Sequence, residues 1–233
     1  MFFDVYYLLL VLPAVILALI ASARVSSTFK KYASVYAKSG MTGAMAARRV
    51  LDAHGLQSVR VERTQGHLSD HYNPKDRTLY LSDAVYGSSS CASIGVAAHE
   101  AGHAIQHAEE YTPLRIRSAI IPATNIGSKL AFPLILIGLL FYYYTPELLI
   151  IAYVGVALFS LTAIFQLVTL PTEFNASRRA LAELESTGIL HKEEIPAARR
   201  VLSAAAMTYV AALAVSLAQL LRLLLILGSR RRD

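Results

Sequence analysis

Two histidines and a glutamate near the middle of the chain have the spacing of a catalytic zinc site. His99, Glu100 and His103 form an H-E-x-x-H motif. Residues four apart lie on one face of a helix, about 6 Å apart along its axis, so both imidazoles can reach one Zn²⁺ ion. Glu100 would project beside the metal without binding it and could take a proton from a zinc-activated water molecule. The motif therefore predicts one Zn²⁺ ion per chain and Glu100 as the general base of a hydrolase.

A catalytic zinc ion needs a third protein ligand and an open fourth position. His107 continues the spacing, but its Cα would lie about 12 Å along the helix axis from that of His99, too far for three rings to meet. Glu173 follows an apolar segment and begins a stretch with helical periodicity. A glutamate on a second helix completes a His₂Glu set, which is known for hydrolytic zinc. We therefore expect His99, His103 and Glu173 to be the metal ligands and His107 to be a polar residue on the cleft side.

The sequence around the motif predicts the helix that must carry it. This helix is expected to begin at residue 89 or 90 and to continue past His107. Three small residues in it are expected to leave room for a metal and a substrate: Ala98, Ala101 and Gly102. Upstream, Thr42 can cap another helix that extends to about His54 and closes at Gly55.

Between these two helices the pattern changes to the alternation of apolar and polar residues that is typical of strands. Val59 and Val61 alternate with charged residues, segment 78–81 resembles a strand, and segment 73–76 is typical of a turn. We predict a small antiparallel sheet of two or three strands. A substrate would lie as an extended strand beside residues 77–82, because a sheet edge can bind a peptide backbone with little choice of sequence.

The composition indicates a membrane protein. Of the 233 residues, 55% are hydrophobic and 16% are charged, whereas a soluble domain has roughly a quarter charged residues. Four apolar stretches reach the length of about 20 residues that a membrane span needs, and they are expected at about 4–23, 120–144, 148–171 and 203–227. The first is not expected to be a cleaved signal peptide, because it starts at an acidic residue and is too long. The fourth either spans the membrane or is re-entrant, since a fourth crossing would place the terminal arginines outside.

The basic residues place both halves of the predicted zinc site on one side of the membrane. Twelve lysines and arginines lie in residues 24–117, five in 173–200 and none in the loop 145–147. The positive-inside rule then puts the first two segments in the cytosol.

The net charge of +6 is thus explained by topology, and nucleic acid is not expected as a partner because no nucleic-acid-binding motif is present. The single cysteine, Cys91, excludes an intrachain disulfide.

Several short runs carry a resemblance to a known family: Asp70-His71-Tyr72, Leu81-Ser82, the run 97–106 around the motif, and the run 173–177. Over nearly its whole length the sequence resembles the YugP-type neutral zinc metallopeptidases of prokaryotic membranes. This resemblance implies a membrane-embedded peptidase of the Glu-ligand zincin group, distantly similar to the HtpX and CAAX-prenyl protease type. In those relatives an aspartate four positions after the ligand glutamate can orient a zinc-binding histidine, and Ser177 occupies that position here.

We therefore expect a mainly α membrane protein with about four transmembrane helices and a small α+β zincin-like cytosolic part, which contains a short antiparallel sheet and the H-E-x-x-H helix. Residues 1–233 are expected to form a single integral-membrane metallopeptidase domain, with cytosolic catalytic parts at 24–117 and 173–200. The expected function is zinc-dependent endopeptidase cleavage of peptide or membrane-protein substrates at the cytosolic face of the cell membrane. The oligomeric state is left open.

Two alternatives belong to other classes. A catalytically inactive zincin-like scaffold or chaperone would have no need to retain Glu100 and Glu173. An intramembrane protease would carry the motif inside a spanning helix, whereas charged residues follow His103 closely. A tetrahedral oxyanion also benefits from a second donor besides the metal, and Tyr209 and Arg178 are the two candidates for that role.

Overall fold

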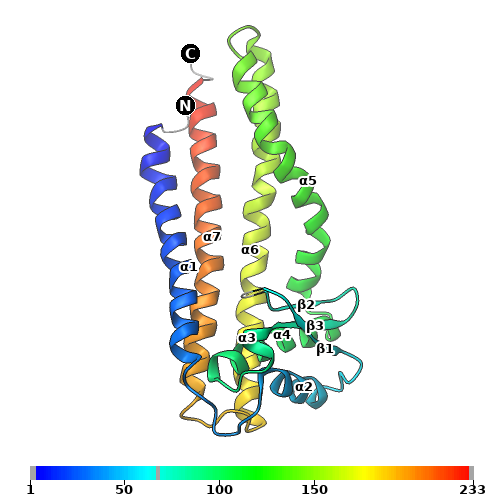
Figure 1. Cartoon of the computed structure of the whole chain (residues 1–233). Coiled ribbons are helices and arrows are strands. Elements are labelled where there is room, and N and C mark those ends of the chain that lie inside the picture. Colours follow the sequence, from blue (N-terminus) through cyan, green and yellow to red (C-terminus); the bar gives the residue numbers. More distant parts are fainter. Residues whose placement is uncertain (1–3, 67–68, 231–233) are drawn as a thin grey trace. The chain divides into compact units, whose positions relative to one another are not determined.

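The computed structural model describes residues 4–66 and 69–230 and consists mainly of helices (Figure 1). Its residues pack into two compact units. Among the described residues, we call the unit formed by segments 4–20, 116–170 and 208–230 the apolar unit, and the unit formed by segments 21–66, 69–115 and 171–207 the mixed unit. The H-E-x-x-H motif belongs to the mixed unit. The predicted fold class, mainly helical with a small α+β part, is confirmed.

The part of the chain that the structure describes contains four helices that are long and apolar enough to cross a membrane. They are α1 (Leu12–Tyr32), α5 (Thr112–Phe141), α6 (Leu149–Ser186) and α7 (Ile195–Arg230). A short π-helix, η1 (Tyr7–Val11), precedes α1, and a short 3-10 helix, η2 (Pro146–Leu148), joins α5 to α6. The helices extend past the predicted spans into charged sequence, because hydropathy marks the apolar stretch and not the end of the helix. The fourth stretch lies within one unbroken helix, α7, which disfavours the re-entrant alternative.

Small residues let α5 and α6 pack closely within the apolar unit. A Cβ atom on Gly138 would collide with the backbone of Ala152, and one on Gly155 would lie 2.7 Å from the backbone oxygen of Ala131. Close backbone approach at small residues is the usual way in which membrane helices associate. The bend of α5 (Figure 1) has a sequence cause, because two prolines lie inside this helix, Pro122 and Pro133.

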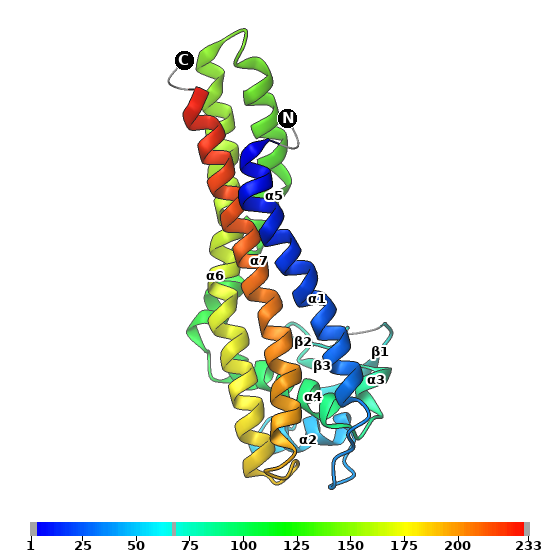
Figure 2. The ribbon, with the colours of Figure 1, turned by 90° about the vertical axis from the view of Figure 1, so that its left-hand side faces the viewer.

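Helices α1 and α7 lie side by side in the apolar unit (Figure 2), and an ion pair links Arg222 on α7 to Asp4, which precedes η1. Nη2 of Arg222 lies 2.6 Å from Oδ2 of Asp4, and its Nε donates to the same oxygen at 3.0 Å. The guanidinium group also lies over the ring of Tyr7, 5.3 Å from its centroid. A paired arginine of this kind can lie in an apolar helix, because its partner offsets part of the cost of desolvation.

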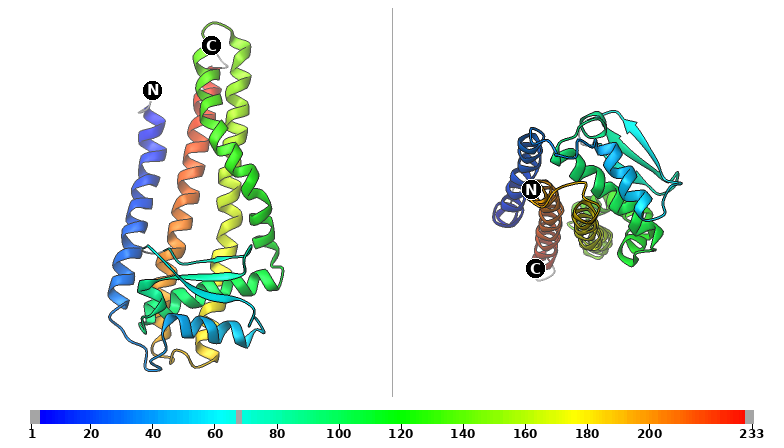
Figure 3. Two further views of the ribbon diagram at one scale, coloured as in Figure 1. Left: turned by 45° about the vertical axis from the view of Figure 1, so that its right-hand side comes forward. Right: turned by 90° about the horizontal axis from the view of Figure 1, so that it is seen from below.

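The mixed unit combines helices with a small sheet (Figure 3). Its shorter elements are α2 (Gly43–Ala53), β1 (Arg60–Thr64), β2 (His71–Asn73), β3 (Thr78–Ser82), α3 (Asp83–Tyr86) and α4 (Cys91–Ala108). The strands among the described residues form one sheet in the order β1-β3-β2. Strand β3 is central, and its Leu79 and Leu81 are fully buried in the core.

The prediction of a wholly antiparallel sheet was wrong for one pair of strands. Strands β2 and β3 form the expected antiparallel hairpin, but β1 pairs with β3 in parallel, with Arg60 opposite Thr78. A parallel pair needs a crossover connection, and the segment 65–77, which contains β2, supplies it. Strand β3 has a partner on each side over residues 78–80, and the Ser82 N–H beyond them donates to the Asp70 carboxylate, so β3 is not the open edge strand that a substrate would need. The edges of the sheet are β1 and β2.

Helix α4 lies in the core of the mixed unit and begins where the sequence predicted. The Ser90 hydroxyl caps it by accepting a hydrogen bond from the Ser93 N–H at 3.1 Å. The prediction for α2 is also confirmed, since Thr42 caps it and Gly55, with a φ of 71°, follows its end. Large apolar side chains from several elements surround α4 in one cluster: Val50, Leu51, Leu79, Leu184 and Leu190.

Candidate metal centre

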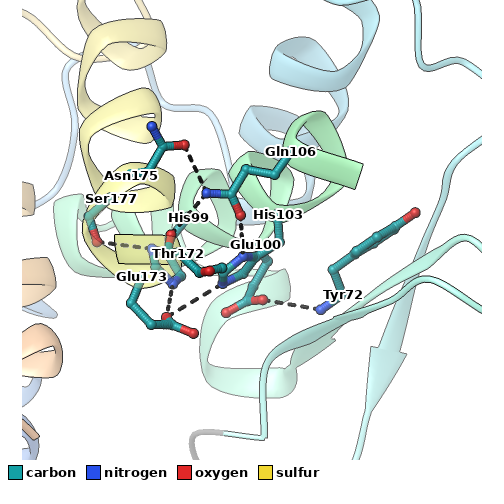
Figure 4. Close-up of polar contacts among 9 residues, drawn as sticks. All are labelled: Tyr72, His99, Glu100, His103, Gln106, Thr172, Glu173, Asn175 and Ser177. Carbon is teal, nitrogen blue, oxygen red and sulfur yellow. Dashed lines mark hydrogen bonds and ion pairs between the residues drawn. The ribbon is translucent and has the colours of Figure 1, made fainter. Parts of the chain in front are cut away.

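The fold brings together the three residues that the sequence named as metal ligands (Figure 4). Helix α4 carries His99 and His103, and helix α6 carries Glu173. Nε2 of His99 lies 3.2 Å from Oε2 of Glu173, and Nε2 of His103 lies 3.5 Å from the same oxygen. One nitrogen or oxygen atom from each residue can be chosen so that all three lie within 4.8 Å of one another. The fold therefore places these three side chains close together, and their role as metal ligands stays a prediction.

The spacing of these atoms fits a zinc ion. Ligand atoms at roughly 2.0–2.1 Å from a tetrahedral ion are about 3.3 Å apart, and the two separations to Glu173 lie on either side of that value. Two imidazoles and a carboxylate are also the ligand types of hydrolytic zinc sites. The Glu173 side chain is 3% exposed, whereas the two rings keep 13% and 12% exposure. The three residues can thus hold a metal at a largely buried position that solvent still reaches through the two histidine rings.

Hydrogen bonds on the far side of each imidazole orient the two rings. Nδ1 of His99 lies 3.1 Å from the Ser177 hydroxyl, and Nδ1 of His103 lies 3.0 Å from Oε1 of Gln106. Partners at Nδ1 leave Nε2 for the metal, and such partners fix the orientation and tautomer of metal-binding histidines. Ser177, four residues after Glu173, is therefore the partner that orients the His99 ring.

Close contact between α4 and α6 makes the site possible, and Gly102 is the reason. A Cβ atom on Gly102 would lie 2.9 Å from the backbone oxygen of Ala176. Ala98 and Ala101 are fully buried in the hydrophobic core. The expectation that these small residues leave room for a metal and a substrate was therefore wrong. They leave room for a neighbouring helix and for the core.

Glu100 is buried beside the two histidines and is held by β2. Its Oε2 accepts a hydrogen bond from the Tyr72 N–H at 3.1 Å. Burial raises the pKa of Glu100, although the neighbouring His99 and His103 act in the opposite direction. A carboxylate with a raised pKa, close to the two histidines and distinct from the candidate ligands, is suited to taking up a proton and releasing it again.

Two of the short runs that carried the family resemblance meet in space and anchor β2. Asp70 accepts hydrogen bonds from the Ser82 N–H at 2.7 Å and from the Ser82 hydroxyl at 3.1 Å. Burial raises the pKa of Asp70, although the bonds from Ser82 act to lower it. This contact ties the start of β2 to the end of β3 and so fixes the strand whose Tyr72 N–H reaches Glu100.

Comparison with known proteins assigns this chain to a family. Residues 7–228 match the model of a family described as "Putative neutral zinc metallopeptidase". The chain belongs to this family. A curated relative from Bacillus subtilis (strain 168), "Putative membrane protease YugP", is 46% identical over 227 residues, which cover 97% of this chain and 99% of the relative. No solved structure gives a significant match. The family implies zinc, and the His99, His103 and Glu173 cluster is the group of described residues that could hold it.

The other candidate residues of the sequence lie outside the cluster formed by His99, His103 and Glu173. Nδ1 of His107 lies 2.9 Å from the hydroxyl of Tyr72, and His107 is not part of the cluster formed by His99, His103 and Glu173. Arg178 is exposed on α6, and Tyr209 lies in the part of α7 that belongs to the apolar unit. Their proposed role as oxyanion donors stays a prediction.

Sequence reasoning gave no role in the site to Gln106, Tyr72 or Asn175. Gln106 lies three residues after His103, on the same face of α4, and this spacing could have indicated its contact with the ring. Tyr72 could not have been found in this way, because its backbone N–H is what contacts Glu100. Asn175 depends on the pairing of α4 with α6, which only the folded chain shows.

Proposed function

We propose that this chain is a zinc-dependent endopeptidase that hydrolyses peptide bonds in peptide or membrane-protein substrates. One observation carries the proposal: His99, His103 and Glu173 converge at distances that suit zinc, with Glu100 buried next to them. When bound there, zinc would polarise the scissile carbonyl group and lower the pKa of a water molecule. Membership of a zinc metallopeptidase family supports the same conclusion.

Glu100 acts as the general base and then as the general acid. It lies in the motif between the two histidines, and its carboxylate is not needed as a metal ligand. It accepts a proton from the attacking water and passes it to the amine that leaves the cleaved bond. The Tyr72 N–H, at 3.1 Å, holds the carboxylate in place for both transfers.

The substrate lies in an extended conformation along β2. This strand is at the edge of the sheet, and the Tyr72 N–H points toward Glu100, so the backbone of Tyr72 faces away from β3. A peptide that pairs with this edge would bring its own backbone next to Glu100, with affinity from main-chain hydrogen bonds. A complex with a peptide inhibitor should show such bonds to β2, and an inhibitor that makes none would count against this arrangement.

The proposed location is the cell membrane, with several spans and the active site at the cytosolic face. Four apolar helices and a relative described as a membrane protease support the membrane location. The side is inferred from the lysines and arginines of segments 24–117 and 173–200, which include both parts of the metal cluster.

The experiment that tests the proposed activity compares Glu100→Gln with the matched variant Glu110→Gln. Glu110 follows the same helix but is exposed and contacts Arg115. In the purified protein, Glu100→Gln should keep zinc and its fold while hydrolysis of a peptide library falls by about 10² to 10⁴, as is typical of a lost acid-base group. Glu110→Gln should hydrolyse normally. Normal hydrolysis by Glu100→Gln would show that the motif is not the active site, and a zinc-loaded wild type without activity would favour the scaffold alternative.

A further inference from the structure

Gln106 has an unusual position for an amide side chain. It is fully buried on α4 and makes hydrogen bonds at both ends (Figure 4). Its Oε1 lies 3.0 Å from Nδ1 of His103. Its Nε2 donates to the backbone oxygen of Thr172 at 2.9 Å and to Oδ1 of Asn175 at 2.8 Å. A buried amide is stable only when its polar atoms are paired, and here both ends are.

These contacts determine which nitrogen of His103 carries the hydrogen. A backbone oxygen can only accept, so the end of Gln106 that faces Thr172 must be the NH₂ group. The other end is then the carbonyl oxygen, which also can only accept. Nδ1 of His103 must therefore donate, and the neutral ring has its lone pair on Nε2. Nε2 is the atom that lies 3.5 Å from Glu173.

The amide end of Gln106 fixes the part of α6 that carries Glu173. Thr172 and Asn175 flank this glutamate in the sequence. Oδ1 of Asn175 also accepts from Nε of Arg179 at 2.8 Å, and Nη2 of Arg179 lies 2.7 Å from Glu109, just beyond the end of α4. The two helices are thus linked at the Gln106 amide and again through Arg179 and Glu109, and their register determines where Glu173 lies relative to His103.

We propose that Gln106 is the positioning residue of the metal centre, because it selects the Nε2 tautomer of His103 and sets the register of Glu173 at the same time. The proposal rests on the metal site of the proposed function and not on proteolysis. Outer partners of metal-binding histidines typically change metal affinity by about 10- to 100-fold. Gln106 acts on one ligand of each helix, because it orients His103 on α4 and positions Glu173 on α6.

The test measures zinc affinity by competition with a chelator, together with the thermal midpoint of the metal-free protein. Gln106→Met keeps the size of the side chain but loses every hydrogen bond, and it should weaken zinc binding by about 10- to 100-fold. Gln106→Glu keeps an acceptor for His103 but loses the donors to α6, so it should recover only part of the affinity, and the thermal midpoint should stay lowered. The control is Gln57→Met, an exposed position that should change neither quantity.

Two outcomes would overturn the proposal. If Gln106→Met lowers the thermal midpoint but leaves zinc affinity unchanged, Gln106 only packs the two helices. If the ring ¹⁵N signals of zinc-loaded wild type show that His103 binds through Nδ1, the tautomer assignment is wrong, and this measurement needs no variant. A wild type that binds no zinc would contradict the proposed function itself, whereas a zinc-binding wild type with an unaffected Gln106→Met contradicts only the role of Gln106.

Discussion

The backbone of Ala176 on α6 lies so close to Gly102 on α4 that a Cβ atom there would be 2.9 Å from the Ala176 oxygen. Gly102 is one of the variable positions within the H-E-x-x-H motif, so this contact occurs between His99 and His103. Glu173 lies one turn before Ala176 on the same helix. The separation of the two helices at this point therefore determines whether the carboxylate can reach both rings.

Replacement of Gly102 by alanine should push the two helices apart. Overpacking of this kind typically costs about 1–3 kcal/mol, and zinc affinity should fall with stability because Glu173 moves away from His99 and His103. Thermal unfolding in detergent and chelator competition would measure both effects. Gly228→Ala is the matched control, since nothing lies within 4 Å of its added Cβ, and it should be neutral or slightly stabilising. Equal behaviour of the two variants would disprove the close contact.

Glu173→Gln should sharply reduce zinc occupancy, because an amide is a poor substitute for the only carboxylate of the metal cluster. The loss of affinity should exceed the roughly 10- to 100-fold that is typical of outer partners. His107→Ala should leave zinc occupancy nearly intact, since this ring contacts the Tyr72 hydroxyl and is not part of the cluster. Metal analysis of the two purified variants would decide, and the reverse pattern would refute the assignment of the third ligand.

The long elements of the fold could be predicted because each has a local physical cause. Hydropathy located the four apolar helices, and capping residues such as Thr42 and Ser90 located the starts of α2 and α4. The parallel pairing of β1 with β3 could not be predicted, because it depends on the route of the chain between residues 65 and 77. A hairpin pattern in the sequence says which strands are neighbours along the chain, and not which strand becomes central.

The residues of the candidate site could be predicted from the sequence for a different reason. His99 and His103 follow from helical spacing alone, and Glu173 followed from its place after an apolar segment in the expected compartment. The partners of these residues were less accessible, because Gln106 and Asn175 acquire their roles only when α4 lies against α6. The role of the small residues was misjudged for the same reason, since a glycine gives no sign of which neighbour approaches it.

Zinc binding should weaken as the pH falls, and the loss should begin at a higher pH than for an ordinary histidine. Burial disfavours the charged form of His103, but the hydrogen bond to Glu173 and the charges of Glu100 and Glu173 outweigh it and raise the pKa of His103 above its ordinary value of 6.5. A proton on Nε2 competes with the metal, and a raised pKa extends this competition to higher pH. Chelator titrations between about pH 8 and pH 6 would measure it, and a constant affinity over that range would contradict the expected competition.

Residues 60 and 192 should face the cytosol, and residue 145 should face outside. Cysteines introduced as Arg60→Cys, Lys192→Cys and Thr145→Cys are all at exposed positions, and Cys91 is fully buried, so Cys91→Ser provides a background without reactive thiols. An impermeant thiol reagent added to intact cells should label only the third variant. Labelling of Arg60→Cys or Lys192→Cys from outside would place that part of the metal centre in the other compartment and would contradict the proposed cytosolic site.

Anomalous scattering at the zinc edge, from crystals of the zinc-loaded chain, tests the central claim most directly because it locates the metal without reference to activity. One peak should appear per chain, within about 2.0–2.2 Å of Nε2 of His99, Nε2 of His103 and a carboxylate oxygen of Glu173. A peak at other residues, or zinc-loaded crystals with no peak at this cluster, would contradict the assignment of these three residues as the metal centre.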